Sequence, residues 1–124
     1  MVTLGLGTAQ FGLDYGTFNK KGKVSFDDSI RIINKAFDYG FRYVDTAQAY
    51  GNAEEIIGKI ENPNRYKIVT KIICKNFLPY KNIRFDLAKL VNKSLKKLSI
   101  EKLHTLMLHD YKDLKLKNSS RLFE

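Results

Sequence analysis

Short apolar stretches typical of β-strands alternate along this chain with longer stretches whose apolar residues recur at the three- and four-residue spacing of a helix. The strand-like stretches are residues 3–6, 42–45, 66–71 and 103–109. The helical stretches are residues 26–39, 53–60 and 83–98. This alternation is typical of successive βαβ units, so we expect an α/β fold.

The expected helix boundaries rest on local capping signals. Ser25 and Asp28 form an S-x-x-D capping pattern at the start of the first helix. Gly40 is suited to the left-handed position just after the end of that helix. We expect the glycine-rich segment 7–22 to be a loop, with no helix directly after the first strand. Near the end of the chain, a Ser-Ser pair is suited to cap a further helix beginning near Arg121.

The strands are short and apolar, which predicts parallel pairing through right-handed crossovers. Two architectures satisfy this requirement, a doubly wound sheet and part of a (β/α)₈ barrel of TIM type. A doubly wound nucleotide-binding sheet carries a G-x-G-x-x-G frame between its first strand and first helix. Gly5, Gly7 and Gly12 follow the first strand but do not fall in that frame. The doubly wound alternative is therefore weakly supported.

Ionisable side chains stand at the carboxyl ends of three expected strands, at Asp45, Lys71 and His109. In a barrel that rim is where active sites are built, and Tyr50 in the loop after Asp45 can reach over it. A tyrosine is a weak acid at neutral pH, but an adjacent ammonium favours its phenolate and eases the loss of its proton. Lys71 can supply that charge, and Asp45 can hold Lys71 protonated. A neutral His109 can then hydrogen-bond a carbonyl oxygen to which Tyr50 gives a proton, which describes carbonyl reduction.

Each of these four side chains also has an ordinary structural explanation when it is taken alone. Asp45 can be a turn former at a strand end, and Lys71 a solvated strand end. Tyr50 can be a packing residue whose hydroxyl is hydrogen-bonded to water, and His109 can be a loop residue. The functional interpretation depends on their joint placement at one rim.

The residues around these positions resemble the motifs of the aldo-keto reductases. The segment 45–54, DTAQAYGNAE, is similar to the family signature D-[ST]-A-x-x-Y-G-x-[SA]-E. Residues 69–71 resemble the family's lysine motif on the third strand, and residues 106–110 its histidine motif on the fourth. Residues 5–8 resemble its first barrel strand, so the likeness runs from the first strand to Glu124.

This resemblance implies a TIM-type barrel and an oxidoreductase that reduces an aldehyde, ketone or sugar carbonyl with NADPH, NADH not being excluded. It also implies that Tyr50 is the general acid toward the carbonyl oxygen. The segment 7–16 looks like that of a bacterial subgroup associated with sugar and surface-polysaccharide pathways. The implied catalytic residues are Asp45, Tyr50, Lys71 and His109, and the implied cofactor-binding residues near the nicotinamide are Gly7, Thr8 and Asp45.

The chain is shorter than such a barrel, which takes about 250 residues. The resemblance therefore implies that residues 1–124 are the N-terminal part of one barrel domain, truncated near the start of the fourth helix. Most of the cofactor site would then be missing, and we expect this chain alone to be inactive. The alternative is a non-catalytic truncated half-barrel, or a module that associates with itself through exposed strand edges and apolar inner faces.

Composition and charge narrow the expected partners. The formal net charge is +9, but the basic residues are spread from Lys20 to Arg121 without a recognition motif, so no nucleic-acid partner is expected. Cys74 is the one cysteine and has no second Cys or His beside it, so neither a disulfide nor a metal site is expected. The first residues do not resemble a secretory leader, and no apolar stretch approaches membrane-spanning length, which predicts a cytoplasmic protein without a membrane partner.

Overall fold

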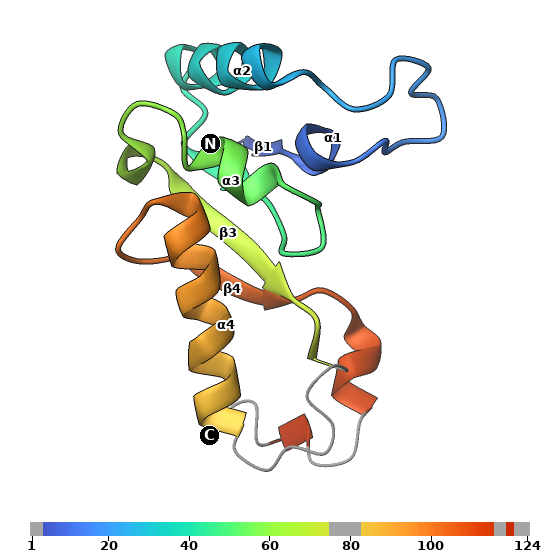
Figure 1. Cartoon of the computed structure of the whole chain (residues 1–124), viewed down its shortest axis with the longest axis vertical. Coiled ribbons are helices and arrows are strands. Elements are labelled where there is room, and N and C mark those ends of the chain that lie inside the picture. The colour runs from blue at the N-terminus through green and yellow to red at the C-terminus, as the bar shows by residue number, and fades with distance from the viewer. Residues whose placement is uncertain (1–3, 75–82, 116–118, 121–124) are drawn as a thin grey trace.

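The computed structural model describes residues 4–74, 83–115 and 119–120, and it shows one parallel sheet with helices packed against it (Figure 1). The sheet has four strands in the order β1-β2-β3-β4, and every neighbouring pair is parallel. Its strands are β1 (Gly5–Gly7), β2 (Tyr43–Asp45), β3 (Lys67–Ile72) and β4 (Thr105–Leu108).

Three helices connect the strands and follow one another from top to bottom in Figure 1. Helix α3 contacts both α2 and α4. The core lies between these helices and one face of the sheet, and it includes Ile33 of α2, Ile57 of α3 and Leu98 of α4. The helices are α2 (Phe26–Asp38), α3 (Ala53–Ile57) and α4 (Ile83–Leu98), with the short helices α1 (Ala9–Gly12), η1 (Pro63–Arg65) and η3 (Tyr111–Lys115).

The two faces of the sheet have different environments. Val44 and Ile68 are buried in the core that they share with the helices, and Ile72 is buried as well. Asp45 and Lys71 alternate with these residues along the strands and are partly exposed. A doubly wound sheet reverses its strand order and carries helices on both faces. Consecutive parallel strands with helices on one face form instead a sector of a (β/α)₈ barrel. The predicted fold class, a partial barrel of TIM type, is confirmed.

Helix α2 begins and ends where its capping signals predict. The Ser25 side chain accepts a hydrogen bond from the backbone N–H of Asp28, at 3.2 Å between donor and acceptor. Such a cap satisfies one of the N–H groups that a helix start leaves without a partner. At the other end, Gly40 has φ +88°, a left-handed conformation that costs least for glycine.

Other boundaries differ from the prediction. The expectation that no helix follows the first strand directly is wrong, because α1 begins at Ala9, two residues after β1. A single turn is too short to show helical periodicity. Strand β4 is shorter than expected because its pairing ends opposite Ile72, and the 3₁₀ helix η3 begins three residues after it. The helix expected from Arg121, and Thr3 of the first strand, lie outside the described residues.

Helix α3 ends at Ile57, three residues earlier than expected, where Gly58 lies against the end of α4. A Cβ added at Gly58 would lie 2.1 Å from the carbonyl oxygen of Lys97, so only glycine permits this approach. Beside it, Lys97 Nζ lies 2.9 Å from a carboxyl oxygen of Glu55. The hydrogen bond and positive charge of Lys97 lower the pKa of the Glu55 carboxyl.

Within the described residues, every helix is too short or too polar to cross a lipid bilayer.

Candidate active site

The structure brings the four predicted catalytic residues to the carboxyl ends of adjacent strands. Asp45 is the last residue of β2, Lys71 lies near the end of β3, and His109 follows β4 directly. Backbone pairing continues past the strand ends, because the His109 N–H donates to the carbonyl oxygen of Ile72 at 2.8 Å. Tyr50 comes from the loop between β2 and α3. Parallel strands all end at the same rim, which is why residues far apart in the sequence meet there.

The ammonium group of Lys71 is the centre of the cluster. Its Nζ donates to Asp45 Oδ1 at 2.6 Å, to the carbonyl oxygen of Thr46 at 3.1 Å and to the Tyr50 hydroxyl at 3.5 Å. A lysine ammonium has three N–H donors and no acceptor, so these contacts use all of them. The side chain of Lys71 is 16% exposed and that of Asp45 is 44% exposed. The positive charge of Lys71 is therefore largely shielded from water, and the carboxyl group of Asp45 pairs with it from one side.

The ring of Tyr50 lies between Lys71 and His109. Lys71 Nζ is 5.1 Å from the centroid of the Tyr50 ring, within the range of a cation–π interaction. The rings of Tyr50 and His109 meet edge to face, with centroids 5.7 Å apart and planes at 77°. His109 Nδ1 is buried and has no hydrogen-bond partner among the described residues. A buried ring nitrogen of this kind is costly unless a ligand or water completes its bonding.

A pocket of about 350 Å³ opens beside Tyr50 at the same rim. Gly7, Thr8 and Asp45, the residues predicted to bind the cofactor, all line it. Thr8 is held to β2 because both its backbone N–H and its hydroxyl donate to the carbonyl oxygen of Asp45, each at 3.0 Å. A Cβ added at Gly7 would meet no atom within 4 Å, so the space beside Gly7 is open. The remaining lining residues, which sequence reasoning missed, are Ala9, Gln10 and Tyr15.

These missed residues belong to α1 and the segment after it. Ala9 and Gln10 start α1, a helix that the sequence pattern does not reveal. Tyr15 lies in the segment interpreted as a plain loop, where nothing in the sequence pattern distinguishes it from Phe11 and Phe18 as a pocket residue.

Gln48 is a further residue of the rim that sequence reasoning missed, because it occupies an unspecified position of the motif. Its side-chain Nε2 donates to the carbonyl oxygen of Leu90 at 2.9 Å and to Ser94 Oγ at 2.8 Å, both in α4. Its backbone N–H donates to the carbonyl oxygen of Lys71 at 3.1 Å. Gln48 therefore joins the loop that carries Tyr50 to both α4 and β3.

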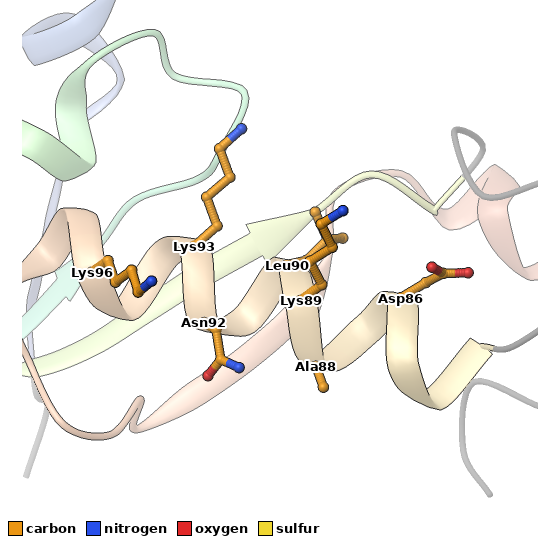
Figure 2. A pocket seen from close by; sticks show the side chains of 7 residues that line it. All are labelled: Asp86, Ala88, Lys89, Leu90, Asn92, Lys93 and Lys96. Atoms are coloured by element: carbon orange, nitrogen blue, oxygen red, sulfur yellow. The ribbon is translucent and has the colours of Figure 1, made fainter.

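A second hollow, of about 760 Å³, lies along α4, and the described residues that line it all belong to that helix. Figure 2 shows that Lys93 projects from one side of the helix, whereas Ala88 and Asn92 project from the opposite side. Side chains that diverge in this way do not converge on one ligand. The described α4 residues along this hollow therefore do not form a binding site by themselves.

Fold and site together define a class, that of parallel α/β-barrel proteins with an acid, a lysine, a tyrosine and a histidine gathered at the carboxyl rim. A sequence model of the aldo/keto reductase family matches residues 3–115, and the chain belongs to this family.

Known proteins agree with this assignment. The chain is 33% identical to the mouse (Mus musculus) aldo-keto reductase family 1 member C13 over 106 residues, which cover 78% of this chain and 31% of the mouse protein. It is 44% identical over 59 residues to the bifunctional protein STORR of Papaver somniferum, covering 48% of this chain and 6% of that protein.

A solved structure from Pseudomonas aeruginosa, described as an aldo-keto reductase, has a TM-score of 0.70 and 26% identity, covering 96% of this chain and 47% of that chain. The chain therefore spans less than half the length of each of these three proteins.

Proposed function

We propose that this chain supplies the catalytic side chains of an NADPH-dependent oxidoreductase that reduces an aldehyde, ketone or sugar carbonyl to an alcohol. In this proposal residues 1–124 are the N-terminal part of one barrel domain. The observation that carries the proposal is the geometry of Lys71, whose ammonium contacts Asp45 and Tyr50 together. Membership of the aldo/keto reductase family supports it.

Tyr50 acts as the general acid in this mechanism. The Lys71 ammonium donates to the Tyr50 hydroxyl oxygen, so the hydroxyl proton is free to point away from Lys71. A cation hydrogen-bonded to the phenol oxygen stabilises the negative charge that develops there as the proton passes to a carbonyl oxygen. Asp45, at 2.6 Å from Nζ, fixes the position of the Lys71 ammonium beside the Tyr50 hydroxyl.

His109 positions the substrate oxygen. Its ring packs against that of Tyr50, so a carbonyl oxygen near the Tyr50 hydroxyl also lies near the imidazole. A neutral imidazole can donate a hydrogen bond to that oxygen from one nitrogen, and the direction of the bond then determines which tautomer is present.

The residues of the rim fit the nicotinamide end of NADPH but not the whole cofactor. The pocket of about 350 Å³ has room for a ring of nicotinamide size, and its open side at Gly7 allows close approach to the backbone. Gly7, Thr8 and Asp45 would hold this end. NADPH, or NADH as the alternative cofactor, would supply the hydride. In barrels of this type the phosphate-binding loops often follow strands seven and eight, so we expect weak or no binding by these residues alone.

The test is to assay this chain alone and joined to the second half of a family barrel, following NADPH consumption with an aldehyde. We expect turnover only in the joined protein. There, Tyr50→Phe should lower kcat by about 10²- to 10⁴-fold and leave cofactor affinity nearly unchanged. Tyr43→Phe is the matched control, since it removes a tyrosine hydroxyl from the opposite end of β2, where its partner is Lys67. Normal turnover by Tyr50→Phe would overturn the assignment of the acid.

A second candidate function, a non-catalytic half-barrel that associates with itself, is favoured by the exposure of β4. Leu106 and Met107 point to opposite faces of this edge strand and are 36% and 47% exposed. Exposed apolar strand edges are sites of association. This candidate predicts dimers or larger species in sedimentation at high concentration, reduced by Met107→Lys. A monomer at high concentration would count against it.

A further inference from the structure

We infer that the backbone contact between Gly12 and Gly51 positions the hydroxyl of Tyr50, so that both glycines are positioning residues for the proton donor. The inference rests on the proposed function, because only that function makes Tyr50 the proton donor. The contact itself is independent of any activity.

Gly12, the last residue of α1, lies directly against the backbone of the loop that carries Tyr50. A Cβ added at Gly12 would lie 1.7 Å from the carbonyl oxygen of Tyr50 and 2.9 Å from the backbone nitrogen of Ala53. These atoms are backbone and cannot rotate away. Any side chain at position 12 therefore requires α1 and the Tyr50 loop to move apart.

Gly51 makes the reciprocal contact. A Cβ added there would lie 2.4 Å from the carbonyl oxygen of Gly12 and 3.4 Å from Leu13 Cδ2. Its φ is +55°, so a side chain at position 51 would meet an unfavourable backbone conformation as well as a steric overlap. The two glycines let two backbones touch immediately beside the residue proposed as the acid.

Both sides of the contact are anchored. Helix α1 is held by Phe11, which is buried in the hydrophobic core, and by the N–H of Val24, which donates to the carbonyl oxygen of Gln10 at 2.9 Å. On the other side, the Tyr50 N–H donates to the carbonyl oxygen of Ala47 at 3.0 Å. A shift forced at the contact is therefore passed on to the neighbouring groups, since packed interiors transmit strain.

A shift at the Gly12–Gly51 contact would change the shape of the pocket, because the pocket lies between α1 and the loop that carries Tyr50. Gln10 of α1 and the Tyr50 side chain both line it, so the contact sets the separation of these two walls. The Tyr50 hydroxyl is already 3.5 Å from Lys71 Nζ, near the outer limit of a hydrogen bond. A misplacement of about 1 Å can cost about 10²-fold in rate.

A matched pair of variants separates positioning from general packing. Gly12→Ala and Gly58→Ala introduce the same methyl group against backbone carbonyl oxygens, 1.7 Å and 2.1 Å away. Only the first contact adjoins Tyr50, since Gly58 packs against the end of α4. Both variants should lower the melting temperature of this chain. We expect only Gly12→Ala to remove the nuclear Overhauser cross-peaks between the Tyr50 and His109 rings in NMR spectra.

A second pair keeps the test decisive if an alanine variant does not fold. Gly51→Asn and Gly40→Asn both place asparagine, which tolerates left-handed φ, at glycines with φ +55° and +88°. A Cβ at Gly40 meets nothing within 4 Å. Gly51→Asn should lose the Tyr50–His109 ring contact and Gly40→Asn should keep it.

The inference is overturned if the ring contact survives in folded Gly12→Ala or Gly51→Asn. It is also overturned if both of these variants fail to fold while their controls fold, because the contact would then serve the whole fold. The NMR signal needs no turnover. If the joined protein shows no NADPH-dependent turnover while Gly12→Ala selectively loses the ring contact, the proposed function fails and the positioning role stands.

Discussion

Replacing Thr70 by valine should cost this protein a large part of its stability. Thr70 is fully buried in β3, at 0% exposed, and its hydroxyl donates to Glu54 Oε1 at 2.7 Å. Glu54, on α3, is itself only 2% exposed. Valine keeps the shape of threonine but cannot donate, so a buried carboxyl oxygen would lose its hydrogen-bond donor.

The size of the expected loss in unfolding free energy follows from the burial of both Thr70 and Glu54. A hydrogen bond contributes about 0.5–1.5 kcal/mol net, whereas a buried acceptor left without its donor carries its full desolvation cost, up to about 3 kcal/mol. We therefore expect a loss of about 3 kcal/mol for Thr70→Val, against a total stability of about 5–15 kcal/mol for a domain of ordinary size. In urea unfolding followed by circular dichroism, the midpoint should fall by about 1–2 M with an unchanged slope.

Thr46→Val is the matched control, because Thr46 is also 0% exposed. Its hydroxyl has no hydrogen-bond partner among the described residues, so a methyl group in its place removes an unsatisfied polar atom. We expect a change of about 0–1 kcal/mol, neutral or stabilising. Equal losses in Thr46→Val and Thr70→Val would refute the reasoning, since the cost would then come from the change of side chain and not from the lost hydrogen bond.

Three further predictions concern helix capping, loop anchoring and pH. Ser25→Ala should lower the free energy of unfolding by about 1 kcal/mol in urea titrations, because the N–H of Asp28 loses its cap. Gln48→Leu removes two hydrogen bonds to α4 and should speed hydrogen exchange of the loop amides, whereas unchanged exchange would contradict the anchoring. Burial, and then the charge of Asp113, raise the pKa of the Cys74 thiol to about 11. The stability from this thiol is complete below about pH 9, the ordinary value from which its pKa is raised, and is lost as the pH rises toward 11. The difference in unfolding free energy between the protein and Cys74→Ala should therefore narrow over that range.

The sequence by itself determined the features that depend on local chemistry. The cap at Ser25 and the stop at Gly40 were predictable because they need only side chains next to the helix that they limit. The parallel order of the strands followed from the alternation of strand and helix patterns. Asp45, Lys71 and His109 were candidates for one site because the carboxyl ends of parallel strands share one rim.

Only the tertiary structure decided which remote groups touch. The pocket wall formed by α1 and the bonds from Gln48 to α4 depend on how backbones far apart in the sequence approach each other. No periodicity in the chain marks Gly12 as the residue that meets Gly51, because a glycine required by a neighbouring backbone looks the same as a glycine in a flexible loop. Several contacts of this kind together fix the position of the Tyr50 hydroxyl. Local patterns specify the elements, while close packing between elements specifies the distances on which the proposed chemistry depends.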